Sequence, residues 1–146
     1  MRPAKVPDGA VARRLGPCLH RLHTRRRQQT HGVGDNPNGI AFFDNTGHYI
    51  ITVLRSDRSR YAANERTQGT ADENKATAQG TFTYFGTYTV SEPDHTIGIH
   101  VVGSSFPNWN ETNQKRTFNV SGDELRLSNP VASTGGTTEV VWKRAR

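Results

Sequence analysis

Residues 82–102 read FTYFGTYTVSEPDHTIGIHVV, and this stretch decides the fold. On both sides of a Pro-Asp turn, aromatic and β-branched residues alternate with small or polar ones, which predicts two antiparallel strands joined as a hairpin. Residues 103–116 then turn through GSSFPNWN and lead into a further strand that begins with QKR. A small antiparallel barrel that holds one organic ligand needs this mixture of aromatic walls and a few orienting polar groups.

The same pattern continues along the chain. Turn residues separate short strands that we expect over residues 39–43, 48–54, 83–90, 95–102, 114–120, 124–128 and 137–144. A capping-box pattern at Thr70 and Glu73 predicts one short helix, which Gly80 ends. Strands in sequential order with this even spacing predict an all-β fold, an antiparallel up-and-down barrel of seven to eight strands with one inserted helix.

The basic charge of the chain is concentrated at its N-terminus. The net charge is +6, but residues 1–31 carry a net +7 and residues 32–146 a net −1. Every Phe, Tyr and Trp lies beyond residue 40, so the tail has little apolar surface to bury and is predicted to be a disordered leader or a start region outside the fold. The alternatives are an arm for nucleic acid or acidic membranes and an Arg-rich targeting leader.

These properties set the domain boundary and exclude several classes of protein. We assign residues 1–33 to an Arg-rich tail or atypical first strand, and residues 34–146 to a barrel domain. The near-neutral body argues against a nucleic-acid interface on the domain. Because the chain has no apolar run of signal-peptide or membrane-span length, we expect a cytoplasmic protein.

The chain also lacks the motifs of metal and cofactor sites. Its single cysteine, Cys18, lies in the tail, so the domain has no thiol chemistry and no Cys-based metal site. There is no zinc motif, phosphate-binding Walker loop or dinucleotide fingerprint. We therefore expect no metal and no cofactor.

Strand alternation predicts an inward-facing arginine. In KRTFNV, residues 115–120, Arg116 shares a face with Phe118 and Val120, and this apolar face should point into the barrel. A buried guanidinium needs a partner. Arg116 is therefore either an anchor for a ligand carboxylate, phenolate or carbonyl, or part of an internal ion pair or a wet barrel mouth.

The aromatic hairpin offers further candidates for the ligand site. Tyr84, Gly86 and Tyr88 share one face, so the two phenols either line the lumen, with room beside Gly86, or belong to the core. In the next strand the pattern favours an outward His100, which leaves a lumen acid–base role and a surface position both open.

The run Phe106-Pro-Asn-Trp109 is the least ordinary in the chain. A mixed aromatic and polar loop at a barrel mouth either caps a ligand or plugs the barrel end. By contrast, Trp142 alternates with Val140 and is expected in the core.

Seven segments, in the order of the chain, resemble the small lipocalin-like domain proteins of bacteria and fungi. They are Gly34–Gly39, Asp44–His48, Arg55–Tyr61, Tyr84–Tyr88, His100–Gly103, Phe106–Trp109 and Gln114–Arg116, and they fall within about residues 34–144. The resemblance implies an eight-stranded up-and-down barrel with a small-molecule cavity. It is specific for the fold and much less so for an activity, because a fold does not fix function.

The chain departs from that family at its first strand. The family usually carries a Gly-Thr-Trp-like segment shortly before the position of Gly34, whereas residues 11–22 here read VARRLGPCLHRL. We expect a misassigned start or reading frame, or a divergent strand. Without the strand, two barrel edges would stay open, and low stability or aggregation would follow.

Three hypotheses for function follow. The first is a non-catalytic binder of a small hydrophobic molecule whose polar or anionic handle is held by Arg116 and His100. The second is a cofactor-independent isomerase or cyclase of secondary metabolism, acting on a natural-product intermediate with His100 and Tyr84 as its acid–base pair. The third is an interaction protein that uses its basic tail. The remaining predicted ligand-binding residues are Tyr84, Tyr88, Phe106, Asn108 and Trp109.

Overall fold

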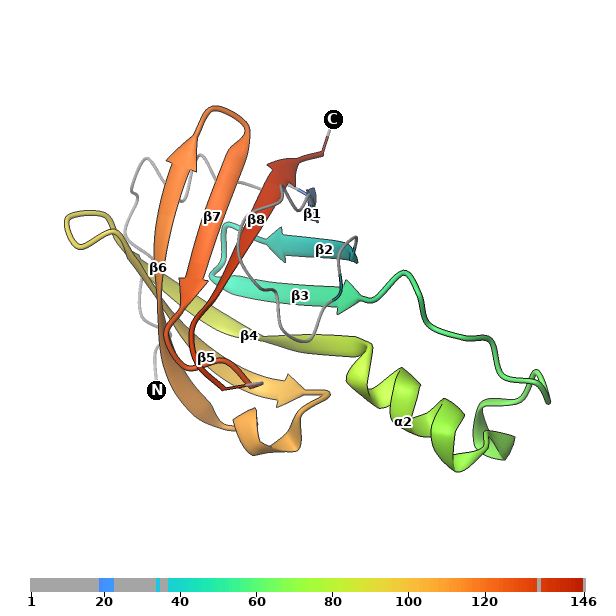
Figure 1. The fold of residues 1–146 in the computed structure, drawn as a ribbon. Coiled ribbons are helices and arrows are strands. Elements are labelled where there is room, and N and C mark those ends of the chain that lie inside the picture. Colours follow the sequence, from blue (N-terminus) through green and yellow to red (C-terminus); the bar gives the residue numbers. More distant parts are fainter. Residues whose placement is uncertain (1–18, 23–33, 35–36, 134, 146) are drawn as a thin grey trace.

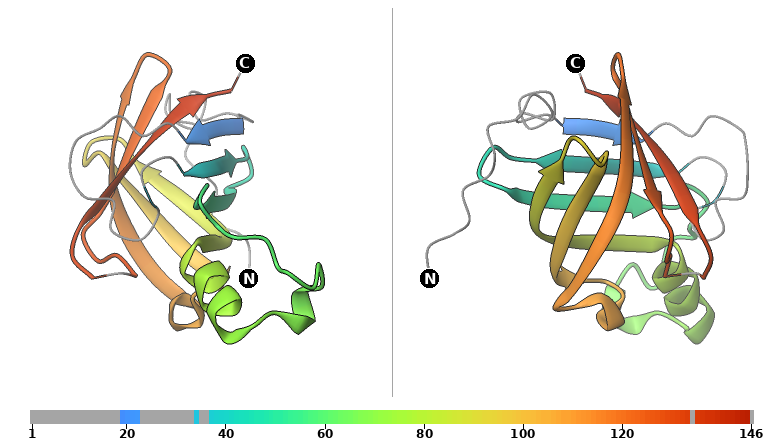
Figure 2. Two further views of the ribbon diagram at one scale, coloured as in Figure 1. Left: turned by 45° about the vertical axis from the view of Figure 1, so that its right-hand side comes forward. Right: turned by 90° about the vertical axis from the view of Figure 1, so that its left-hand side faces the viewer.

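Eight antiparallel strands in sequence order form a closed barrel (Figures 1 and 2). The computed structural model describes residues 19–22, 34, 37–133 and 135–145. The strands are β1 Leu19–Leu22, β2 Asn38–Phe43, β3 His48–Leu54, β4 Thr81–Ser91, β5 Thr96–Ser104, β6 Thr112–Ser121, β7 Glu124–Asn129 and β8 Thr138–Arg144. The helix α2 spans Ala71–Gln79, and short 3₁₀ turns lie at Arg66–Gln68 (η1) and Pro107–Trp109 (η2). The predicted all-β up-and-down barrel with one inserted helix is confirmed.

The short strand β1 completes the ring. Its backbone pairs with β2 on one side, where Leu19 is opposite Phe42, and with β8 on the other, where Leu22 is opposite Trp142. The first strand is therefore present with a divergent sequence, and the two open edges that its absence would have left do not occur. The predicted disorder of the rest of the tail concerns residues outside the described part of the chain.

Local sequence signals explain where the elements begin and end. In the β2–β3 hairpin, Asp44 accepts hydrogen bonds from the backbone N–H groups of Thr46 and His48, and Gly47 adopts the positive φ that such turns require. At the start of α2, the Thr70 hydroxyl and the Glu73 carboxylate bond each other's backbone N–H groups. The predicted capping box is thus present.

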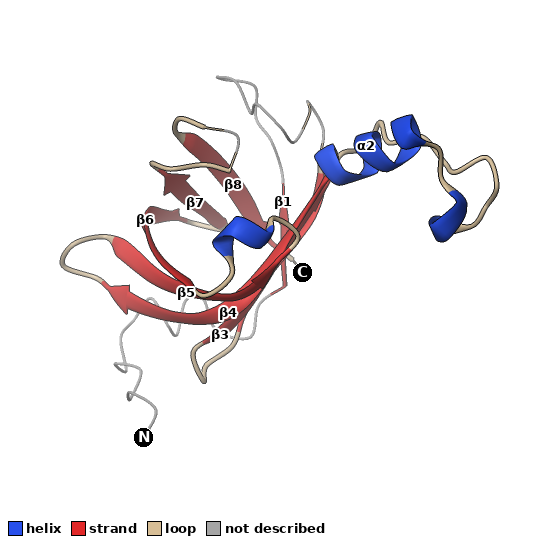
Figure 3. Ribbon diagram, turned by 90° about the horizontal axis from the view of Figure 1, so that it is seen from below, coloured by secondary structure: helices blue, strands red, loops and turns tan. Residues whose placement is uncertain are grey.

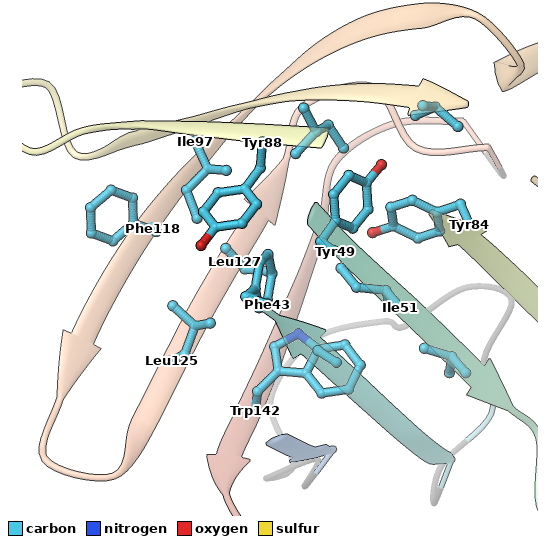
Figure 4. Packing of buried hydrophobic residues seen from close by; sticks show 14 of the residues in the cluster. Phe43, Tyr49, Ile51, Tyr84, Tyr88, Ile97, Phe118, Leu125, Leu127 and Trp142 are labelled. Carbon is cyan, nitrogen blue, oxygen red and sulfur yellow. The ribbon is translucent and has the colours of Figure 1, made fainter. Parts of the chain in front are cut away.

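Alternation along the strands separates a buried face from an exposed face. On β4, Tyr84 and Tyr88 are buried while Phe85 and Thr87 are exposed. The interior cluster packs aromatic rings from several strands, with the rings of Phe43 and Tyr88 in an edge-to-face contact at 5.2 Å (Figure 4). The predicted core position of Trp142 is confirmed, since only 1% of this residue is exposed.

Gly86 lies at an irregularity in the pairing of β4 with β5. The register shifts between Phe85 and Gly86, and a Cβ atom at Gly86 would come within 1.9 Å of the His100 carbonyl oxygen. We expected this glycine to leave room beside the two phenols. Its main effect is instead to let two backbones approach closely at a β-bulge.

The helix α2 projects from the barrel at the start of β4 (Figure 3). None of its residues is buried, and its capping contacts come from its own N-terminal loop: Glu73 accepts from the Ala62 N–H, and the Tyr61 hydroxyl donates to Asn74. The strands β3, β5 and β7 run in the same direction and all end at the end of the barrel where this helix is attached. The β3–β4, β5–β6 and β7–β8 connections therefore lie together at that end.

We predict that Gly86→Ala destabilises the protein by about 1–3 kcal/mol, because the methyl group meets backbone atoms that cannot move aside. Chemical denaturation measures the change. Gly98→Ala is the matched control, since its methyl group meets only the Thr89 hydroxyl, at 3.0 Å, and should change the free energy of unfolding by less than about 1 kcal/mol. Equal effects of the two substitutions would contradict this role for Gly86.

We further predict that the stabilisation by Asp44 is lost in acid. Burial raises the pKa of Asp44, but hydrogen bonds from His48 and Thr46 outweigh it and hold the pKa below its ordinary value. The stabilisation is then complete above the pKa of the unfolded chain and falls as pH drops through the lower folded value. Asp44→Ala should cost about 1–2 kcal/mol near neutrality. Below about pH 4 the difference from wild type should shrink, whereas Asn45→Ala, an exposed control in the same turn, should cost little at any pH.

Candidate functional site

A cavity of about 580 Å³ opens at the α2 end of the barrel. Its floor and walls are side chains of β3, β4, β6, β7 and β8, and its rim includes residues of α2 and of the β5–β6 and β7–β8 connections. The lining residues are Ile51, Val53, Arg55, Ala78, Gln79, Thr81, Phe82, Tyr84, Ser105, Phe106, Trp109, Arg116, Leu127, Asn129, Ala132, Ser133, Thr138, Val140 and Trp142. A volume of this size fits one small organic molecule.

Four aromatic rings form a continuous wall beside the mouth. Trp109, on η2, lies edge-to-face against Phe82 at 5.0 Å and against Tyr84 at 5.5 Å. Phe106 approaches Trp109 at 6.3 Å. Trp109 is 9% exposed, so the mixed aromatic and polar run of the β5–β6 connection places an indole inside the barrel and leaves its polar residues outside.

Arg116 extends from β6 into this wall. It is 5% exposed, and its guanidinium lies over the Trp109 ring, 5.3 Å from the ring centroid. It donates to the side chain of Gln114 and, at 3.4 Å, to the Lys115 carbonyl. Among the described residues, no carboxylate lies within ion-pair distance of Arg116, and the groups that act on its charge are the phenols of Tyr84 and Tyr49. The alternative of an internal ion pair therefore finds no acidic partner in the described part of the chain.

Two neutral phenols lie beside this cation. Tyr49 from β3 and Tyr84 from β4 are neighbours in the interior, with ring centroids 5.8 Å apart (Figure 4). Burial raises the pKa of both tyrosines, and this outweighs the opposite effect of Arg116. Both hydroxyl groups are therefore protonated at physiological pH and available as donors. The buried Tyr49 hydroxyl has no hydrogen-bond partner in the described structure.

The lining is positively charged and contains no acid. Arg116 lies deep in the cavity and Arg55 at its rim, where Arg55 also binds the exposed Asp57 carboxylate at 2.7 Å. None of the lining residues is Asp, Glu, His or Lys. The electrostatic character of this cavity thus favours a ligand with negative charge or strong acceptor oxygens.

The structure brings only some of the predicted site residues together. Tyr84, Phe106, Trp109 and Arg116 line the cavity. The other three, Tyr88, Asn108 and His100, lie outside the cavity lining.

Tyr88 lies deeper in the barrel, where its hydroxyl donates to the Asp44 carbonyl at 2.6 Å. Asn108 is exposed on η2. His100 lies on the outer face of β5, where it contacts Asn113 at 3.0 Å and Glu111 at 3.5 Å. The side chains of Ile99 and Val101 occupy the inner face, so alternation directs His100 outward, as the strand pattern favoured.

Some lining residues escaped the sequence analysis although their signal was present. Phe82 alternates with Tyr84, and the lining residues Ile51 and Val53 alternate with the buried Tyr49, so all of them lie on inward faces. Asn129 continues the inward row of Leu125 and Leu127. Alternation of side chains between the two faces, applied to every strand, predicts these residues. It cannot predict the rim residues that come from loops, because loops have no such alternation.

Two further properties bear on the class of protein. In the part of the chain that the structure describes, no three His, Cys, Asp or Glu side chains gather into a group that could hold a metal ion. Nor do the described residues include a helix long and apolar enough to cross a membrane.

Comparison with known proteins identifies the family. Residues 20–145 match the model of the lipocalin-like domain, and the matched region includes most of β1 and all of β2 to β8. The chain therefore belongs to the lipocalin-like domain family. A search of curated proteins finds no match. A lipocalin-like barrel suggests the binding of a small molecule.

We predict that two equally buried tyrosines respond in opposite ways to loss of the hydroxyl group. Tyr49→Phe should leave the stability of the free protein unchanged or raise it by about 1 kcal/mol, because an unpaired buried donor is removed. Tyr88→Phe should lower it by about 1 kcal/mol, because the bond to Asp44 is lost. Thermal and chemical unfolding of both variants test this, and a loss of stability in Tyr49→Phe would show that its hydroxyl has a partner.

Proposed function

We propose that this protein binds one small hydrophobic molecule in the barrel cavity and holds an anionic or strongly accepting oxygen handle of that molecule with Arg116. The observation that carries the proposal is a buried guanidinium at the wall of an apolar cavity, with no carboxylate partner among the described residues. A buried charge without a counter-ion is costly, and a ligand anion would offset that cost when it binds.

Neighbouring groups support the same choice of ligand. The hydroxyls of Tyr49 and Tyr84 are neutral donors beside the guanidinium, so up to three donor side chains converge on one region. Charge-assisted hydrogen bonds of this kind are stronger than neutral ones. The aromatic wall of Phe82, Trp109 and Phe106 would contact the apolar body of the ligand.

The alternative hypothesis of an enzyme depends on His100 and Tyr84, and these two residues lie on opposite faces of the barrel wall. An isomerase or cyclase using His100 and Tyr84 needs both groups to reach the same substrate, and His100 lies on the opposite side of the barrel wall. The lining contains donors and cations but no histidine or carboxylate to accept a proton. Binding without chemistry is therefore the function that this cavity supports best.

A matched pair of probes tests the proposal. 1-Anilinonaphthalene-8-sulfonate carries a sulfonate, and N-phenyl-1-naphthylamine has the same aromatic body without it. We predict that Arg116→Met weakens sulfonate binding about 10- to 100-fold, the equivalent of a charged hydrogen bond worth about 1.5–3 kcal/mol. Binding of the neutral probe should change little. Titration calorimetry gives the affinity and the stoichiometry.

Lys115→Met is the control, because Lys115 is the exposed neighbour of Arg116 on β6 and carries the same formal charge. It should leave the affinity for both probes nearly unchanged. The Arg116→Met variant should fold, since replacing a buried unpaired charge with an apolar side chain relieves desolvation, and circular dichroism checks this. The proposal fails if Arg116→Met and Lys115→Met weaken sulfonate binding equally, or if neither does.

A further inference from the structure

The outer wall formed by β2, β3, β4 and β5 exposes large apolar side chains. Of the five large hydrophobic residues that are well exposed in the described structure, four lie on these strands: Ile40, Ile50, Phe85 and Val102, each between 38% and 45% exposed. Isolated exposed hydrophobic residues are ordinary, but a contiguous group on one face marks an interaction surface.

The strand register shows that these residues are contiguous. Ile50 is opposite Phe85 on one side and opposite Phe42 on the other. Phe85 in turn is opposite Gly103, and a Cβ atom at Gly103 would lie 2.7 Å from the Phe85 ring, so this ring lies over Gly103 of β5. The apolar group thus runs continuously over four neighbouring strands.

The same wall carries no formal charge. The sequences of β2, β3, β4 and β5 contain no Asp, Glu, Lys or Arg. Between the apolar residues lie threonines, two of which, Thr52 and Thr83, bond each other across the strands at 2.7 Å. His48 and His100 flank the patch, and each has an acidic neighbour, Asp44 and Glu111 respectively.

The remaining strands of the barrel have the opposite character. The outer faces of β6, β7 and β8 carry Lys115, Arg126, Glu139 and Lys143, and Arg126 forms ion pairs with Glu124 and Glu139. One half of the barrel therefore has an ordinary charged surface, and the other half is neutral and partly apolar. Depletion of charge together with exposed aromatic and aliphatic residues distinguishes the centre of a protein–protein interface.

We propose that the β2–β5 wall is the interface of a symmetric homodimer, in which the walls of two copies pack face to face. A two-fold interface brings the same surface of both chains together, so any charge near its centre would face an identical charge. A neutral wall of Ile, Phe, Val and Thr avoids this repulsion and buries apolar surface on both copies. The cavity mouth lies at the end of the barrel, so a partner on the wall leaves it open.

Light scattering coupled to size-exclusion chromatography of the full chain tests the proposal. The molar mass measured for the wild-type protein should be twice the 16.2 kDa of one chain. Ile50→Lys and Phe85→Lys each place a positive charge on the wall of both copies, inside the proposed interface, and should raise the dimer dissociation constant at least about tenfold. Val131→Lys is the control, because Val131 is 73% exposed on the β7–β8 connection and lies outside the wall; its mass should equal that of wild type.

Thr87→Lys provides a second test that does not alter an apolar side chain. Thr87 is exposed on the same wall, opposite His48 and His100, and its replacement should also favour the monomer while circular dichroism shows an unchanged fold. A wild-type protein that is monomeric at every concentration overturns the proposal. So does a dimer that persists unchanged in Ile50→Lys, Phe85→Lys and Thr87→Lys. Neither result depends on whether the cavity binds the probes used above.

Discussion

The closed ring of strand pairing is the constraint on which the rest of this structure depends. Once β1 pairs with both β2 and β8, each residue of the long strands must point either into the barrel or out of it. A shift of one residue in any strand would exchange its two faces. In β6 such a shift would bring Lys115 inside in place of Arg116. Closure therefore holds each strand in one register, and the apolar row that alternation predicts is the row that faces inward.

Closure also explains why a cation lies among aromatic rings. Arg116 occupies the same inward row as the buried Phe118, so the packing that buries one residue buries the other. The guanidinium is accommodated by Gln114, by the Lys115 carbonyl and by the face of Trp109, all of which are local to β6 or to the loop before it. Such contacts reduce the cost of burial without neutralising the charge. The site therefore retains a positive electrostatic potential.

The two faces of the barrel wall have separate consequences. Inward residues of β3 and β4 supply the phenols beside Arg116, and outward residues of the same strands supply the exposed pair Ile50 and Phe85. Because neighbouring residues in a strand belong to opposite faces, adjacent substitutions can alter the cavity lining and the outer wall independently. A substitution on the outer wall therefore leaves the cavity lining unchanged, and a substitution in the lining leaves the outer wall unchanged.

Seven of the eight strands, the capped helix and the alternation of faces could be predicted from the sequence, because these features depend on residues close together in the chain. The inward positions of Tyr84, Arg116 and Trp142 follow from the alternation of side chains along a strand. Tertiary structure decided the rest. The four-residue strand β1, with the sequence LHRL, closes the barrel because backbone pairing with β2 and β8 needs no particular side chain. Tyr49 meets Arg116, and Phe85 meets Ile50, because register joins residues far apart in sequence, and no local pattern specifies which strands become neighbours.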